Sequence, residues 1–197
     1  MGGGPLVAAF DFDGTITRRD TLVPFLRHVA GRVGFTRGFL GALPAAGGRE
    51  RRDAYKAAVL QRVLGGRDAD ELLTTARAYG AGLHAGFRPA IVERIRWHQG
   101  EGHRVVVVSA SLRAYLDPVV EHLGLDGVCA VELEVADDGQ LTGAIVGRNC
   151  RGPEKVRRLM DWLGGERPER LWAYGNSSGD RELLAAADEP TWVRRRS

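Results

Sequence analysis

Four consecutive valines at positions 105–108 constrain the fold more than any other stretch of this sequence. An apolar run without polar alternation is typical of a strand buried on both faces, as in a parallel sheet. Further strands are predicted at 5–12, 128–135, 141–147, 170–175 and 191–193. Helical patterns are predicted at 89–99, 153–163 and 180–187. This alternation predicts an α/β fold with a doubly wound, mainly parallel sheet.

Residues 20–85 interrupt the alternation, because they contain helical patterns and no convincing strand. Helices are predicted at 21–30, 50–64 and 68–83, with a break rich in glycine, alanine and proline at 41–48. We therefore expect a helical cap, residues 20–85, inserted after the first strand. The core would then consist of residues 1–19 and 86–197.

Two local patterns add detail to the predicted core. Asp117 and Pro118 are typical of a helix N-cap followed by proline, and that helix would end at Gly124. Asp137-Asp138-Gly139 separates the strands predicted at 128–135 and 141–147, which indicates a hairpin turn.

Composition excludes several classes of protein. A chain of 197 residues with 27% charged residues is typical of one globular domain with an insertion, and not of a disordered chain. Only Cys129 and Cys150 are present, which favours reduced thiols in a cytosolic protein. No apolar run reaches the roughly 18 residues of a membrane span, and residues 1–5 lack signal-peptide features. We therefore expect a cytoplasmic protein.

The net charge of +3 mildly favours anionic partners. Nucleic-acid binding ranks last among the functions considered, because the chain has neither a recognised motif nor a basic stripe interleaved with aromatic residues. The five histidines have no metal-like spacing and are expected at the surface or in the core.

Polar side chains follow three of the predicted strands, where ligands bind in open α/β sheets. A lysine also occupies the first turn of the helix predicted at 153–163, where a positive charge is unfavourable for the helix dipole unless an anion lies nearby. These residues are Asp11, Asp13, Thr15, Ser109, Ser111, Lys155, Asn176 and Asp180.

Asp11 and Asp13 form the pair with the clearest chemical meaning. Two like charges this close are costly unless a cation or a proton lies between them, and Mg²⁺ is the preferred cation for oxygen ligands. One carboxylate could act as a nucleophile and the other as a general acid and base. Lys155, the Ser109 hydroxyl and backbone N–H groups at helix starts could hold a phosphoryl group.

Each of these residues also has a purely structural explanation. Asp11 and Asp13 are compatible with solvated acids in a turn, and Ser109 with a helix cap. Lys155 is compatible with an exposed lysine on an amphipathic helix, and Asp180 with a helix N-cap. The order and context of the segments favour the functional interpretation.

The segment Asp11-Phe12-Asp13-Gly14-Thr15 resembles the first motif of the haloacid dehalogenase-like hydrolases. Ser109, Lys155 and residues 175–180 follow in the order and context of that family, so the resemblance covers the whole chain. The helical insertion resembles the cap of the phosphoserine-phosphatase-like subfamily IB. Residues 17–22 and 149–155 are most similar to a bacterial subgroup that includes phosphatidylglycerophosphatase C-like proteins.

The resemblance implies a Mg²⁺-dependent phosphomonoester hydrolase that acts on a small or lipid-derived phosphate ester. Asp11 would form an aspartyl-phosphate, and Asp13 would protonate the leaving oxygen and then activate water. Ser109 and Lys155 would bind the phosphoryl group, supported by Thr15, which would orient the loop around Asp13. The metal ligands would be Asp11, the backbone carbonyl of Asp13, Asn176 and Asp180.

Two positions qualify this resemblance. The family usually has aspartate where this chain has Asn176, and an amide ligates a hard cation without contributing charge. Metal affinity should therefore be lower and the dependence on Asp180 greater. Asp20 aligns with an acidic cap residue that contacts the substrate amine in phosphoserine phosphatases, although we favour a helix N-cap with Thr21 at this position.

Alternative functions remain within and outside the same fold. Phosphoryl transfer to another acceptor is one, and a weakly catalytic protein that binds phosphorylated metabolites is another, supported by Asn176. Dehalogenation is disfavoured by Asp13. Residues 22–46 combine apolar residues with Arg27, Arg32 and Arg37, which is compatible with peripheral contact to anionic lipid. A cap helix packed on its neighbours is the favoured explanation, and the sequence leaves the oligomeric state open.

Overall fold

The computed structural model describes residues 4–42 and 51–194. Its main sheet has five parallel strands in the order β3-β2-β1-β6-β7. The strands are β1 (Leu6–Phe10), β2 (Arg104–Leu112), β3 (Gly127–Val131), β6 (Arg170–Gly175) and β7 (Glu189–Trp192). β1 lies between β2 and β6, so the strand order reverses beside it. The carboxyl end of β1 is therefore the place where this architecture binds ligands.

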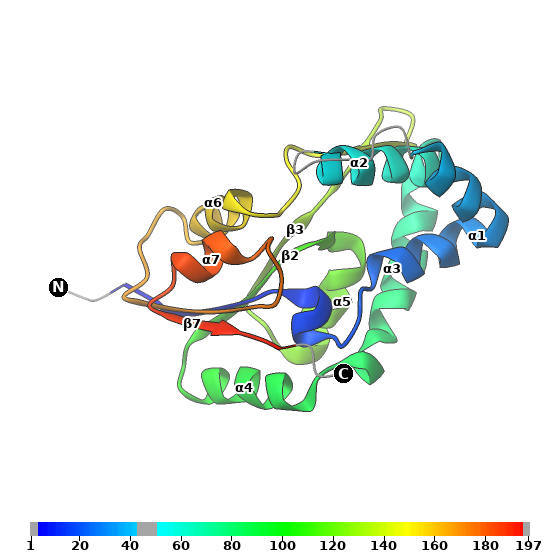
Figure 1. Ribbon diagram of the computed structural model, residues 1–197. Helices are drawn as coiled ribbons and strands as arrows, with labels where there is room; N and C mark the ends of the chain where they lie inside the picture. The colour runs from blue at the N-terminus through cyan, green and yellow to red at the C-terminus, as the bar shows by residue number, and fades with distance from the viewer. Residues whose placement is uncertain (1–3, 43–50, 195–197) are drawn as a thin grey trace.

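Helices cover both faces of this sheet, as the doubly wound prediction requires. In Figure 1, α4 lies on the opposite side of the sheet from α6 and α7. The helices that flank the main sheet are α4 (Pro89–Gly100), α5 (Arg113–Leu123), α6 (Pro153–Trp162) and α7 (Arg181–Ala185). The predicted α/β class and the mainly parallel sheet are confirmed.

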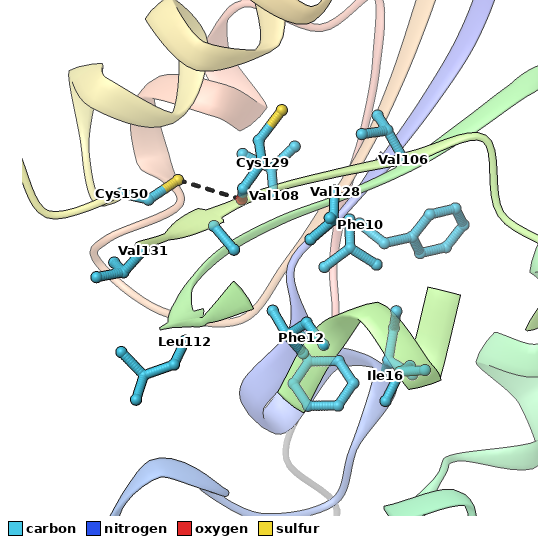
Figure 2. Packing of buried hydrophobic residues seen from close by; sticks show 14 of the residues in the cluster. Phe10, Phe12, Ile16, Val106, Val108, Leu112, Val128, Cys129, Val131 and Cys150 are labelled. Carbon is cyan, nitrogen blue, oxygen red and sulfur yellow. Dashed lines mark hydrogen bonds between the residues drawn. The ribbon is translucent and has the colours of Figure 1, made fainter. Parts of the chain in front are cut away.

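The core is formed by the central strands and the helices that pack on them. Residues Val105 to Val108 are fully buried, as the valine run predicts for a central strand. Figure 2 shows Phe10, Val106, Val108 and Val128 gathered around β1, β2 and β3. Cys129 and Cys150 are both free and buried, and the Cys150 thiol donates to the Cys129 carbonyl at 3.5 Å.

The segment between β1 and α4 is helical, as predicted. It contains a single turn, η1 (Phe12–Ile16), then α1 (Leu22–Gly41), α2 (Arg51–Leu64), α3 (Ala69–Ala81) and a short turn, η3 (Leu83–Gly86). Helices α1, α2 and α3 lie together beyond one end of the sheet (Figure 1). Among the described helices, none is long and apolar enough to cross a membrane.

The helix predicted at 21–30 forms the first part of α1, which is kinked at Gly31. At Gly31 the backbone has φ 68°, which glycine adopts readily, and the helical conformation resumes beyond it. The predicted break at 41–48 lies outside the described residues from position 43 onward.

The prediction of one strand at 128–135 is wrong in one respect, because this segment forms two strands. β3 belongs to the main sheet, whereas β4 (Leu133–Val135) pairs antiparallel with β5 (Leu141–Ile145). This hairpin packs against the end of α2, where the Gly66 amide donates to the Leu141 carbonyl at 2.8 Å. The division into residues 20–85 and the remainder stays a prediction, because part of the predicted core contacts the predicted cap.

The start of α5 also differs from the prediction. The helix begins at Arg113 and not at Asp117, so Pro118 lies inside it. A proline at this position removes one helical hydrogen bond, and the burial of Pro118 helps to offset that loss. Asp117 faces Arg113 at 3.5 Å across one helical turn. The predicted end at Gly124 is confirmed, with φ 62°.

Candidate active site

The carboxyl ends of β1, β2 and β6 surround a cavity of about 210 Å³. Every residue with a predicted catalytic, phosphate-binding, metal-binding or substrate-binding role lines it except Thr15, although these residues come from distant parts of the chain. The lining consists of Asp11, Asp13, Asp20, Ser109, Ala110, Arg151, Lys155, Asn176, Ser177, Gly179 and Asp180.

Lys155 is the cation at the centre of this cavity. Its Nζ lies 2.6 Å from Asp11 Oδ1 and 2.6 Å from Asp180 Oδ1, and its side chain is 2% exposed. Burial alone would lower its pKa, but the adjacent Asp11 and Asp180 raise the pKa above its ordinary value. Lys155 is therefore charged, and the explanation as an exposed surface lysine is wrong.

Asp11 is held on both carboxylate oxygens. Lys155 binds Oδ1, and the buried Thr15 hydroxyl donates to Oδ2 at 2.9 Å. Burial raises the pKa of Asp11, and Lys155 counteracts that rise. Because Thr15 contacts Asp11 and lies outside the cavity lining, its predicted support of phosphate binding or of the Asp13 loop stays a prediction.

Asp180 organises the loop that follows β6. Its Oδ2 accepts hydrogen bonds from the Asn176 and Ser177 amides at 3.1 and 2.8 Å and from the Ser177 hydroxyl at 2.8 Å. Burial raises its pKa, but Lys155 and Ser177 outweigh that effect and lower it. Asp180 occupies the N-cap position of α7, but its side chain makes no capping bond there, so capping does not account for its carboxylate.

Asn176 carries a buried polar atom without a partner among the described residues, its amide nitrogen Nδ2. The amide packs on Gly14, where an added Cβ would lie 2.0 Å from Nδ2. A half-turn of the amide exchanges its nitrogen and oxygen, which would place a carbonyl oxygen at the orphaned position. The residue therefore fits a cation ligand, because a bound hard cation would satisfy that oxygen.

Side-chain acids alone do not make a metal site here. Across residues 4–42 and 51–194, no three His, Cys, Asp or Glu side chains are arranged to hold a metal ion. A site would need neutral oxygen donors, such as an amide or a backbone carbonyl, beside the Asp11 carboxylate. Such oxygen donors suit Mg²⁺ and similar hard cations.

Asp13 is held by neutral donors from two directions. Oδ1 accepts from the Thr21 amide at 2.9 Å and the Thr21 hydroxyl at 2.7 Å, while the Ser111 hydroxyl donates to Oδ2 at 2.5 Å. Burial, together with the negative charge of Asp20, raises the pKa of Asp13 to about 7. A carboxyl group with this pKa can give and take a proton near neutral pH.

Ser109 and Asp20 combine structural roles with positions on the cavity wall. Ser109 Oγ accepts from the Ser111 amide at 3.0 Å, and α5 begins only at Arg113, so Ser109 does not cap that helix. Asp20 Oδ1 accepts from the Val23 amide at 3.0 Å, which confirms its capping of the first turn of α1.

Several polar residues at or near the cavity were not assigned a role from the sequence, among them Arg151 and Ser177 of its lining. Thr21 and Ser111 bind Asp13, although only Ser111 follows a strand. Lys56 of α2 donates to the Ala110 carbonyl and to Asn149 Oδ1. Its signal in the sequence is weak, because it is one charge within the otherwise apolar stretch 54–60.

Comparisons with known proteins agree with this geometry. The sequence profile of the haloacid dehalogenase-like hydrolases matches residues 8–185. Protein CicA of Caulobacter vibrioides is 38% identical over 195 residues, covering 96% of this chain and 86% of that protein. A phosphoserine phosphatase of Albidiferax ferrireducens is 28% identical over 185 residues, covering 91% and 74%.

A solved structure supports the fold. The crystal structure of a phosphoserine phosphatase in its apo form superposes with a TM-score of 0.63 at 20% identity, covering 93% of this chain and 83% of that chain. The family profile spans most of the chain, including the strand-end residues around the cavity. The chain therefore belongs to the haloacid dehalogenase-like hydrolases and is a phosphatase-type enzyme of that family, similar to phosphoserine phosphatases.

Proposed function

We propose that this protein hydrolyses phosphomonoesters through a covalent intermediate on Asp11, with Mg²⁺ as cofactor. The observation that carries the proposal is the pairing of two different carboxyl groups in one cavity. Asp11 is bound by the charged Lys155, whereas Asp13 is held by hydroxyl and amide donors and has a pKa of about 7. The first arrangement suits a nucleophile, and the second suits a general acid and base.

The proposed reaction has two steps. In the first, an Asp11 oxygen attacks phosphorus, the bond from phosphorus to the ester oxygen breaks, and Asp13 gives its proton to the departing alcohol. In the second, the Asp13 carboxylate takes a proton from water as that water attacks the phosphoryl group. The bond between Asp11 and phosphorus breaks, which releases inorganic phosphate and restores both carboxyl groups.

Lys155 and Ser109 would bind the phosphoryl oxygens during both steps. Lys155 already lies between Asp11 and Asp180, so its charge is fixed where negative charge develops. Ser109 is buried beside the cavity, and its hydroxyl hydrogen is available because its oxygen accepts the Ser111 amide. Thr15 would keep Asp11 in position through its hydrogen bond to Oδ2.

Phosphatases of this family generally use a divalent metal. For this chain we propose Mg²⁺, held by the Asp11 carboxylate, the Asp13 backbone carbonyl and the Asn176 amide oxygen. Asp180 would be a further ligand, and its Oδ2 also holds the Asn176 and Ser177 amides. The bound cation would neutralise phosphoryl charge and orient the ester for attack.

The test is release of inorganic phosphate from a panel of phosphomonoesters, with and without Mg²⁺. The panel includes phosphoserine, sugar phosphates, nucleotides, glycerol phosphates and a phosphatidylglycerophosphate. We expect Mg²⁺-dependent turnover that is lost in Asp11→Asn. Transfer to an added alcohol in preference to water would instead identify a phosphotransferase. Binding of Mg²⁺ and phosphate esters without turnover would identify a binding protein.

Contact with anionic lipid is a separate proposal about α1. The exposed Val33, Arg37 and Leu40 lie on one side of this helix, so apolar and cationic groups face solvent together. We expect pelleting with anionic liposomes at low salt and weaker pelleting with neutral ones. Absence of pelleting with either would contradict the proposal. Location in the cytoplasm also stays a prediction.

A further inference from the structure

Lys56 links the cap helix α2 to the core through partly buried hydrogen bonds. Its Nζ donates to the Ala110 carbonyl and lies 2.6 Å from Asn149 Oδ1. The Asn149 amide in turn donates to Asp53 Oδ1 at 2.7 Å, and Asp53 lies one turn before Lys56 on the same helix. The three side chains therefore form a chain of hydrogen bonds that leaves α2, reaches the core and returns.

The position of Lys56 separates it from the residues that face the ligand. Ala110 lines the candidate catalytic cavity, whereas Lys56 is not among the residues that line it. Both acceptors of the Lys56 ammonium are neutral oxygens. Burial lowers the pKa of Lys56 to about 8, although Asp53 partly opposes this shift. A buried amine with two fixed acceptors is a specific contact and not a solvated surface charge.

Ala110 is the residue through which this contact can affect chemistry. It stands between Ser109 and Ser111, and the Ser111 amide donates to Ser109 Oγ while the Ser111 hydroxyl donates to Asp13. The pairing of β2 with β3 shifts register between Val108 and Leu112, so this segment departs from the regular ladder. A donor from α2 therefore fixes a carbonyl in the irregular part of β2.

We propose that Lys56 is a positioning residue that couples the seating of α2 to the geometry of segment 109–111, with Asn149 and Asp53 keeping its ammonium aimed at Ala110. When α2 is seated, Ser109 and Ser111 are held in the orientation that phosphoryl binding and Asp13 require. When α2 moves away, the Ala110 carbonyl loses its donor and the segment loosens. The catalytic consequence rests on the proposed function, but the coupling itself can be measured without turnover.

Hydrogen exchange of the full chain tests the coupling directly. Lys56→Met keeps the apolar stem and removes the donor, so we expect faster exchange both in α2 and at backbone amides 109–112. Arg52→Met is the matched control, because Arg52 is an exposed cation on the same helix. It should leave segment 109–112 unchanged. Exchange that rises in α2 alone, or in neither segment, would overturn the proposal.

Two further variants keep the test decisive if Lys56→Met folds poorly. Asp53→Ala removes the acceptor of the Asn149 amide and leaves the amine in place, so exchange at 109–112 should rise by a smaller factor. Lys56→Arg retains a charged donor and should restore much of the protection. Protection at 109–112 that is unaffected by Asp53→Ala and by Lys56→Met would contradict a coupling role.

Kinetics distinguish positioning from direct contact with substrate. A positioning role predicts that Lys56→Met lowers kcat by about 10-fold to 100-fold with a similar factor for every substrate, because the same segment serves each one. A rise in KM for phosphate esters of only one class of alcohol, with hydrogen exchange at 109–112 unchanged, would show direct contact with the substrate and overturn the proposal. If the wild-type protein releases no phosphate, the proposed function fails, while hydrogen exchange still decides the coupling.

Discussion

Two regions of the candidate catalytic cavity surround their buried carboxylates with different partners. In the floor, formed by Asp11, Lys155 and Asp180, the buried Lys155 lowers the pKa of Asp180 and counteracts the rise that burial causes in the pKa of Asp11. In the cap-side wall, formed by Asp13, Thr21 and Asp20, the donors to Asp13 among residues 4–42 and 51–194 are all neutral. There burial and the Asp20 charge raise the pKa of Asp13 to about 7.

The difference separates two chemical tasks. The floor keeps charges fixed, which suits the binding of a phosphoryl group and the support of a nucleophile. The wall keeps a carboxyl group near the point where it both loses and gains a proton. The contrast arises because the floor is built by strand ends and α6, whereas part of the wall is provided by the start of α1.

Removing the cation from the floor should give the largest effect. Lys155→Met leaves Asp11 and Asp180 buried without a counter-charge, so we expect a loss of about 3–5 kcal/mol in the free energy of unfolding at neutral pH. Turnover should fall by roughly 1,000-fold, because the phosphoryl group loses its fixed cation. Urea denaturation and phosphate release measure the two effects.

Arg157→Met on the same helix is the control for that variant. Arg157 pairs with Glu154 and Asp161 at the surface, where ion pairs contribute about 0–1 kcal/mol. If the two variants are equally stable, the floor does not depend on its buried cation and the contrast between the regions fails.

Weakening the wall should reduce catalysis with little effect on folding. Thr21→Val removes the hydroxyl donor to Asp13 Oδ1 while retaining the backbone donor, so kcat should fall by roughly 10-fold. Asp13 must be protonated to act as an acid, so activity should decline as pH rises through about 7. Because the lost donor favoured the carboxylate, this decline should shift to higher pH in the variant.

Thr36→Val provides the comparison, since the Thr36 hydroxyl bonds the Arg32 carbonyl on the exposed part of α1. Its kcat and pH profile should match the wild type. A profile that is unchanged in Thr21→Val would mean that the wall does not set the proton affinity of Asp13.

The buried His98 has no counter-charge among the described residues, so burial lowers its pKa. Its Nδ1 lies 2.8 Å from His103 Nδ1 and its Nε2 lies 2.8 Å from the Tyr174 hydroxyl. Burial, then His103 and Arg94, lowers the pKa of His98 to about 4. In the unfolded chain His98 takes up a proton near pH 6.5, whereas in the folded chain it does so only near pH 4. The folded state is therefore destabilised relative to the unfolded state as pH falls from about 6.5 towards 4.

We expect a contribution of about 1–2 kcal/mol to the loss of stability between pH 7 and pH 4.5. Urea denaturation at both pH values measures this loss, and His98→Gln should show a smaller decrease. An equal decrease in the variant would assign the pH dependence to other groups.

The smallest expected effect concerns Asn176, a neutral residue beside the floor. Asn176→Asp adds a carboxylate at the position of the orphaned amide, so the Mg²⁺ activation constant should decrease by a few-fold to about 10-fold. Titration of phosphate release with Mg²⁺ checks this change. Ser178→Asp adds the same charge in the same loop and is the control. An unchanged or weaker constant in Asn176→Asp would count against a ligand role.

The sequence predicted the parallel sheet and the polar residues that meet at its carboxyl ends. The valine run, the polar residues after β1 and β6, and the serines near the end of β2 carry that information locally. The split of 128–135 and the early start of α5 were missed, because the packing of the hairpin on α2 and the burial of Pro118 are tertiary effects.

The cap-side contribution was harder to predict for the same reason. Thr21 resembles an ordinary residue before a helix, and its bond to Asp13 depends on how η1 turns back towards α1. Lys56 has no strand-end signal, and its partners Ala110 and Asn149 are 54 and 93 residues away in the chain. Long-range contacts of this kind have no periodicity that a single sequence reveals.

Rapid acid quench of Asp13→Asn during turnover of 4-nitrophenyl phosphate with Mg²⁺ tests the central claim most directly. A good leaving group reduces the need for the acid, while the lost base slows hydrolysis of the intermediate. We predict that peptide mapping by mass spectrometry finds one phosphoryl group, on Asp11. A phosphoryl group on another residue, or continued turnover by Asp11→Asn at the wild-type rate, would contradict the account.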